Sequence, residues 1–150
     1  MSKRVKKRIL DVGVYGGKFR ITLDVYENVT IVVGNSGTGK SYMVNLISRL
    51  VAGGQLNNAV VINYKNKHMV DTIKSYKNKL IFIDNADTLL SNELKRYIAY
   101  DESNYYIIMG RETQYLEGSP FRVANIVANE SSIQLDYFLA DCFIDYDPFA

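Results

Sequence analysis

The stretch IVVGNSGTGKSYM, residues 31–43, constrains this chain more than any other part of its sequence. Three apolar residues typical of a β-strand run directly into a loop with three glycines, and the loop ends at Lys40 and Ser41. Glycines let the backbone curl until several N–H groups face one anion, and a helix that follows directs its positive end at the same anion. The stretch therefore predicts a strand, a phosphate-binding loop and a helix, in that order.

Eight residues of this stretch match the pattern G-x-x-x-x-G-K-[ST]. In such a loop the backbone N–H groups hold the phosphates, Lys40 reaches the β- and γ-phosphates, and the Ser41 hydroxyl coordinates Mg²⁺. We expect ATP and Mg²⁺ as cofactors, and ATP rather than GTP because the sequence has no N-K-x-D motif of the kind that binds guanine. The residues expected to hold the nucleotide are Gly34, Asn35, Ser36, Gly37, Thr38, Gly39, Lys40 and Ser41.

A second candidate motif is the run LIFID, residues 80–84, in which four apolar residues precede an aspartate. The apolar run predicts a buried strand, with Asp84 at its carboxyl end. Parallel sheets bind ligands at that edge, so we expect Asp84 to lie beside the phosphate loop and to hold Mg²⁺ through water. One further strand, AVVIN at residues 59–63, is expected between the two motifs.

The two motifs and their strand order resemble the P-loop NTPases of the additional-strand division, in particular small AAA-like and STAND-like ATP-binding proteins. The resemblance covers roughly residues 29–111 and identifies residues 80–84 as a Walker B motif. Members of this division commonly carry a glutamate after that aspartate, whereas this chain has Asn85, which cannot accept a proton. The run FIDNAD resembles a variant in which a later carboxylate, here Asp87, takes the catalytic role. The alternative hypothesis is that Asp87 is the N-cap of the next helix.

A third candidate lies in YIIMGRE, residues 106–112, which predicts a buried strand ending in Gly110 and Arg111. In the additional-strand division this strand lies between the Walker B strand and the P-loop strand. The resemblance therefore implies that Arg111 faces the γ-phosphate, where a guanidinium senses or stabilises charge. The alternative is a surface ion pair with Glu112. The residues expected to be catalytic are Lys40, Asp87 and Arg111.

The distribution of apolar residues predicts an α/β fold. Alternating runs at 9–15 and 18–26 flank Gly16-Gly17 and predict an N-terminal β-hairpin. Continuously apolar strands separated by helical segments predict a mostly parallel sheet that is covered on both faces. The expected class is a three-layer P-loop NTPase fold with a mostly parallel central sheet and an N-terminal β-hairpin. We expect a single nucleotide-binding domain over residues 1–150, closed by strands at 122–128 and 132–138.

Composition adds weaker expectations. The chain has one cysteine and no apolar run of the length that a membrane span needs, which favours a cytoplasmic protein without a membrane partner. Residues 3–8 hold five basic side chains, which indicates either a nucleic-acid-binding arm or an ordinary solvated terminus. The twelve tyrosines are scattered, and we interpret them as packing residues rather than as a cofactor site.

These features together predict an ATP-binding protein whose Mg²⁺-dependent hydrolysis is slow or stimulated by a partner. The sequence lacks the helical lid of AAA+ proteins, so we expect a protein partner or a second copy to complete the site. One alternative is a non-hydrolytic, ATP-dependent switch, which Asn85 favours. A small-molecule kinase and a nucleic-acid-associated ATPase are further alternatives. Only Arg122 follows Arg111 among the basic residues, which counts against a kinase with an arginine-bearing lid.

Overall fold

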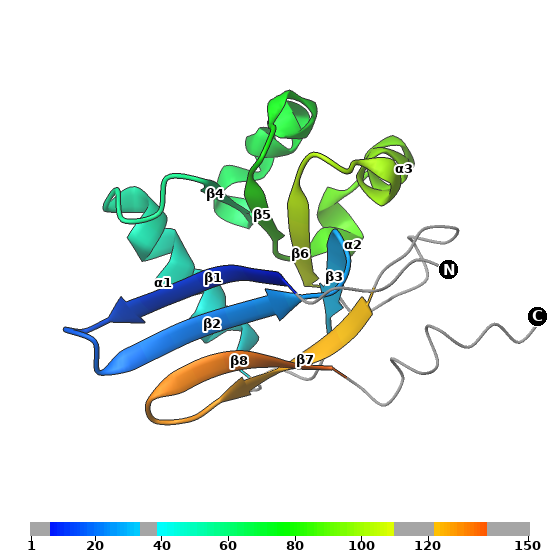
Figure 1. Cartoon of the computed structure of the whole chain (residues 1–150). Helices are drawn as coiled ribbons and strands as arrows, with labels where there is room; N and C mark the ends of the chain where they lie inside the picture. The colour runs from blue at the N-terminus through cyan, green and yellow to red at the C-terminus, as the bar shows by residue number, and fades with distance from the viewer. Residues whose placement is uncertain (1–6, 34–38, 110–121, 138–150) are drawn as a thin grey trace, which may run out of the picture.

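The computed structural model describes residues 7–33, 39–109 and 122–137. Eight strands form one sheet in the order β1-β2-β8-β7-β3-β6-β5-β4 (Figure 1). The strands are β1 (Lys7–Val14), β2 (Phe19–Val25), β3 (Val29–Val32), β4 (Ala59–Ile62), β5 (Leu80–Ile83), β6 (Tyr105–Met109), β7 (Arg122–Ala128) and β8 (Ser132–Tyr137).

The described helices lie between β3 and β6 in the sequence. They are α1 (Lys40–Ala52), the 3₁₀ segment η1 (Tyr64–Ser75), α2 (Ala86–Leu89) and α3 (Asn92–Tyr100). α2 and α3 are separate helices, because Leu90 has an extended backbone and Ser91 starts α3 by accepting the Leu94 N–H with its side chain.

The sheet is mixed. Five neighbouring strands are parallel to one another, in the row β7-β3-β6-β5-β4. Strand β2 is parallel to β8. The pairs β1–β2 and β7–β8 are antiparallel. The expected hairpin around Gly16-Gly17 is confirmed by the β1–β2 pair, and β6 lies between β3 and β5, the order that the resemblance implies.

The sheet curls into a half-barrel, and α1 fills its concave side (Figure 1). Apolar residues three and four positions apart place one face of α1 in the core. This face packs with inward side chains from both ends of the curled sheet, so one cluster joins β1 and β2 to β4 and β5. The buried residues of α1 are Met43, Val44, Leu46, Ile47 and Leu50.

The convex side is covered over only part of its width. Over β3, β6, β5 and β4, a second apolar cluster packs against η1, α2 and α3, which explains why β3 and β5 are buried at every residue. On β2 the buried residues alternate with more exposed ones, and on β8 a single buried residue stands among exposed and half-buried ones. The outward side chains of β2 include Arg20, which is exposed, and Thr22 and Asp24, which are half-buried.

The expected three-layer P-loop NTPase fold, with a mostly parallel central sheet covered on both faces, is therefore wrong. The described residues form a strand-rich, mixed sheet of eight strands curled into a half-barrel, with few helices. The physical reason lies in β1, β2, β7 and β8, which join the same sheet as the central strands. Two antiparallel pairs thereby extend the sheet beyond the width that the available helices cover.

Candidate functional site

The predicted phosphate loop connects β3 to α1. Residues 34–38, which include five of the expected nucleotide-binding residues, lie outside the described residues. Gly39, the last glycine of the motif, is the N-cap of α1 and has a left-handed backbone with φ 101° and ψ −2°. A Cβ at this position would lie 3.2 Å from the Ala128 Cβ, closer than nearly all such contacts. Both the backbone conformation and the close approach of β7 therefore favour glycine at position 39.

The first turn of α1 suits an anion. Among the described residues no side chain accepts a hydrogen bond at its N-cap, and its first turn has no acidic residue. Free helix N–H groups and the positive end of the helix dipole favour a phosphate at such an end. Lys40 and Ser41 are the first two helical residues, with Lys40 half-buried and Ser41 exposed. The chemistry expected of both residues is compatible with these positions.

Asp84 follows β5 at the carboxyl edge of the parallel strands. Its N–H donates to the Ile62 carbonyl at 2.8 Å, and its Oδ1 accepts the Asn85 N–H at 3.0 Å. In the sheet register Ile83 pairs with Ile108, and Ile108 pairs with Ile31 of β3. Two strand spacings, about 10 Å, thus separate the end of β5 from the end of β3 along one edge. The half-buried Asp84 carboxylate and the start of α1 lie on this edge.

Asn85 occupies the position where the resembled family commonly carries a glutamate. Its backbone is left-handed, with φ 56° and ψ 42°, and it serves as the N-cap of α2 without a side-chain hydrogen bond. Asp87 is the second residue of α2, so the alternative that made Asp87 an N-cap is wrong. The side chain of Asp87 and all of Arg111 lie outside the described part of the chain, and their expected roles stay predictions.

Three aromatic residues near the start of α1 were not expected in the site. Tyr42, in the first turn of α1, packs edge-on against Phe19 of β2 with ring centroids 5.9 Å apart. Tyr15, in the β1–β2 turn, is 57% exposed. Partial desolvation first, and then the Tyr15 hydroxyl, raise the pKa of the Tyr42 hydroxyl. Sequence reasoning missed the group because its members lie up to 27 positions apart.

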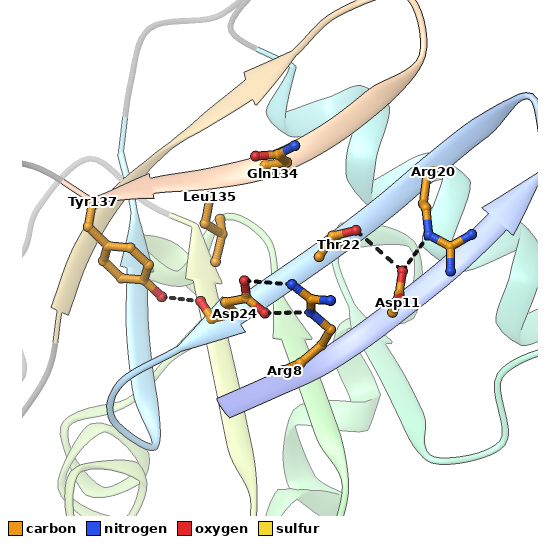
Figure 2. Close-up of a pocket in the computed structure, with 8 residues that line it drawn as sticks. All are labelled: Arg8, Asp11, Arg20, Thr22, Asp24, Gln134, Leu135 and Tyr137. Carbon is orange, nitrogen blue, oxygen red and sulfur yellow. Dashed lines mark hydrogen bonds and ion pairs between the residues drawn. The ribbon is translucent and has the colours of Figure 1, made fainter. Parts of the chain in front are cut away.

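A separate groove of about 490 Å³ lies on the convex face of β1, β2 and β8 (Figure 2). Two ion pairs line it: Arg8 with Asp24 at 2.8 Å, and Arg20 with Asp11 at 2.6 Å. The Arg8 and Arg20 guanidiniums thus meet carboxylates of the neighbouring strand. The groove includes none of the residues predicted for the site.

Ser41 and Asp84 carry oxygen atoms of the kind that Mg²⁺ prefers, but the described residues do not form a dedicated metal centre. Within residues 7–33, 39–109 and 122–137, no three His, Cys, Asp or Glu side chains gather as a metal site. Mg²⁺ commonly uses one or two protein oxygen ligands together with phosphate oxygens and water. The Ser41 hydroxyl and the Asp84 carboxylate supply oxygen ligands of that kind, and the open start of α1 suits the phosphates.

A comparison with protein-family models and one with curated protein sequences each found no match. Among solved structures, the chain is similar to a chain in the crystal structure of the complex of archaeal ribosomal stalk protein aP1 and archaeal ribosome recycling factor aABCE1. The TM-score is 0.51 at 10% sequence identity, and the match covers 99% of this chain and 45% of the other. This chain thus spans less than half the length of the chain it matches, and the likeness concerns the fold alone.

None of the helices in the described part of the chain combines the length and the apolar character that crossing a membrane requires.

Proposed function

We propose that this chain binds ATP with Mg²⁺ and hydrolyses it slowly, or only when a partner stimulates it. One observation carries the proposal: the G-x-x-x-x-G-K-[ST] sequence connects the carboxyl end of β3 to the N-terminus of α1. A loop of this sequence between a strand and a helix is the context in which backbone N–H groups hold phosphates. The kinship that we propose with the additional-strand P-loop NTPases rests on these motifs and on strand order.

Three features of the described residues support the proposal. Gly39 has the left-handed conformation that lets the loop enter the helix, and no side chain of the described residues caps the start of α1. Lys40 is the first helical residue, from which its ammonium group is expected to reach the phosphates. Asp84 lies at the same edge of the sheet, at the end of the buried strand β5.

A non-hydrolytic switch is the second candidate, and Asn85 favours it. An amide cannot take a proton from water, and the left-handed backbone of Asn85 starts α2 directly after the Asp84 carboxylate. ATP would then act by ordering the segments around Asp84, and a protein partner would bind the ordered form. In either case we propose a cytoplasmic protein that needs a partner or a second copy to complete its site. We retain a role of residues 3–8 in nucleic-acid binding only as a minor alternative.

Binding is tested first, by isothermal titration of the full chain with ATP in the presence of Mg²⁺. We expect saturable binding by the wild type and its loss in Lys40→Ala, because the neutral side chain no longer attracts phosphate. Lys77→Ala is the matched control, since Lys77 is exposed in the segment that leads into the opposite edge of β5. Wild-type protein that does not bind ATP, or that binds it equally after Lys40→Ala, would refute the proposal.

Turnover of ATP then separates the two candidates. If the wild type releases phosphate from ATP, and Asp87→Asn binds ATP but releases none, the chain is an ATPase that uses this carboxylate. The switch would be identified by two results together. The wild type and all variants would show no turnover, and the wild type would bind ATP tightly in a Mg²⁺-dependent manner that Asp84→Asn removes. ATP turnover that neither Lys40→Ala nor Asp87→Asn changes would come from a contaminant and would support neither candidate function.

A further inference from the structure

Strand β1 forms one edge of the sheet, and among the described strands it pairs with β2 alone (Figure 1). An edge strand presents a row of backbone N–H and C=O groups to any further strand, and proteins usually block such a row with charges or bulges. The first half of β1 is blocked in this way, because it carries Lys7 and Arg8 and its register shifts between Arg8 and Leu10. The second half pairs regularly from Leu10 to Val14 and carries a single charge, Asp11. This second half is therefore the part of the edge that suits a further strand.

The two faces of this half-strand restrict which strand can join it. Leu10, Val12 and Val14 pack with the apolar cluster on the concave side, Val12 only half-buried, whereas Asp11 and Gly13 are exposed. Opposite residues of an antiparallel pair share a face, so a joining strand must show the same alternation in the same register. A second copy of the half-strand does so when Val12 lies opposite itself. Leu10 then lies opposite Val14 of the second copy, and Asp11 lies opposite Gly13 of the second copy.

Arg20 makes this register complementary in charge. Its Nε donates to the Asp11 Oδ1 at 2.6 Å across the β1–β2 pair (Figure 2), and one Nη lies 3.7 Å from the place that a Cβ on Gly13 would take. Gly13 has no side chain to separate this guanidinium from a carboxylate on a joining strand. Asp11 of the second copy lies opposite Gly13, so it meets the guanidinium, whose five N–H donors suffice for both carboxylates. Two-fold symmetry repeats this contact, whereas a register with Asp11 opposite itself would bring two like charges together.

We propose that two copies of this chain associate through β1, antiparallel along residues 10–14, with Val12 at the two-fold axis. The two eight-stranded sheets then become one continuous sheet, held by main-chain hydrogen bonds between the two edges. Contacts of Arg20 with Asp11 of the second copy fix the register. The proposal is independent of ATP binding, because none of the residues predicted for the nucleotide site lies in this half of β1.

Sedimentation equilibrium of the full chain, without nucleotide, tests the proposal. We expect the wild type to form a dimer in a concentration-dependent manner. Asp11→Arg and Arg20→Asp each place like charges between the two copies, so each variant alone should dimerise at least about tenfold more weakly. An equimolar mixture of the two variants should regain a dimer, because each copy then supplies the charge that the other lacks. A change in folding alone would not be reversed by mixing.

Arg8→Asp is the matched control. Arg8 forms the same kind of ion pair with Asp24 between the same two strands, and its side chain is 58% exposed against 56% for Arg20, but it lies outside residues 10–14. Arg8→Asp should therefore dimerise like the wild type. A wild type that stays monomeric at every concentration would overturn the proposal and leave the edge to another occupant. A dimer that neither Asp11→Arg nor Arg20→Asp weakens, or a mixture of these variants that stays monomeric, would overturn it as well.

Discussion

Asp101 illustrates how much one side chain organises at the amino edge of the sheet. Its carboxylate accepts hydrogen bonds from the Tyr106 hydroxyl at 2.6 Å, the Asn104 amide at 2.7 Å and the Ser103 N–H at 2.9 Å. Asn104 in turn accepts the Lys79 N–H and donates to the Tyr76 carbonyl. A single carboxylate thus connects the end of α3 to the starts of β5 and β6, opposite the predicted site.

This network predicts a pH-dependent contribution to stability. Burial alone would raise the pKa of Asp101, but hydrogen bonds from Ser103 and Tyr106 outweigh burial and lower it. A carboxyl whose folded pKa is depressed stabilises the fold above its unfolded pKa, about 3.9, and loses that contribution as pH falls through the folded value. We expect Asp101→Asn to cost about 1 kcal/mol of unfolding free energy at pH 7, discounted for partial exposure. Urea unfolding from pH 7 to pH 2.5 should show this difference shrinking toward zero.

Other carboxylates contribute to acid unfolding, so the prediction concerns a difference between variants. Asp11→Asn is the control for a carboxyl on the surface. The Arg20 guanidinium also lowers the pKa of the Asp11 carboxyl, but their ion pair is exposed. The prediction fails if the difference between the wild type and Asp101→Asn is the same at pH 7 and pH 2.5.

At the scale of elements, the junction between the loop and α1 depends on one glycine. Gly39→Ala would combine two costs: an unfavourable positive φ, and a Cβ only 3.2 Å from Ala128 and 3.4 Å from Ile126. We expect a loss of about 1–3 kcal/mol in the free energy of unfolding. Gly54→Ala is the matched control, because Gly54 has φ 78° with no atom within 4 Å of an added Cβ.

Urea unfolding of both variants measures the two costs separately. Gly54→Ala reports the cost of backbone conformation alone, and the larger loss expected in Gly39→Ala reports the close contact between α1 and β7. Equal losses in the two variants would show that the junction adapts and that β7 does not constrain the start of the helix.

The same scale shows which elements can be predicted from the sequence. The run Leu80–Ile83 is a strand with the expected bounds, and Ala59–Ile62 ends one residue before the expected bound at 63, because burial of a strand leaves an uninterrupted apolar run. The start of the helix after β5 was not predicted correctly. There a left-handed Asn85 starts α2 two positions before Asp87, and no pattern in FIDNAD indicates that backbone conformation.

The candidate site could be predicted where its residues are close in sequence. The loop motif identifies Gly39, Lys40 and Ser41 directly, whereas Phe19 and Tyr42 come together only because the hairpin folds against α1. Such a contact joins residues far apart in the sequence, so neither composition nor periodicity predicts it. Scattered tyrosines therefore gave no signal, although the positive φ of Tyr15 marks the turn as unusual once it is known.

At the scale of the molecule, the layering was predicted wrongly because coverage of a sheet depends on its total width. The alternation in β2 indicates one exposed face, but nothing local indicates that β2 pairs with β8 and so joins the central strands. The outcome is a half-barrel whose concave side holds α1, and none of the described helices covers its convex side over β1, β2 and β8.

Adjacent residues of β2 test this one-sided burial. Ile21 is fully buried on the concave side, whereas Arg20 is exposed on the convex side and pairs with Asp11. We expect Ile21→Ala to cost about 2–5 kcal/mol of unfolding free energy, because it opens a cavity in the core. Arg20→Ala should leave the urea unfolding midpoint close to that of the wild type, because exposed ion pairs contribute little. A large loss in Arg20→Ala would mean that a further part of the protein covers the convex face, and comparable losses in both variants would contradict the half-barrel.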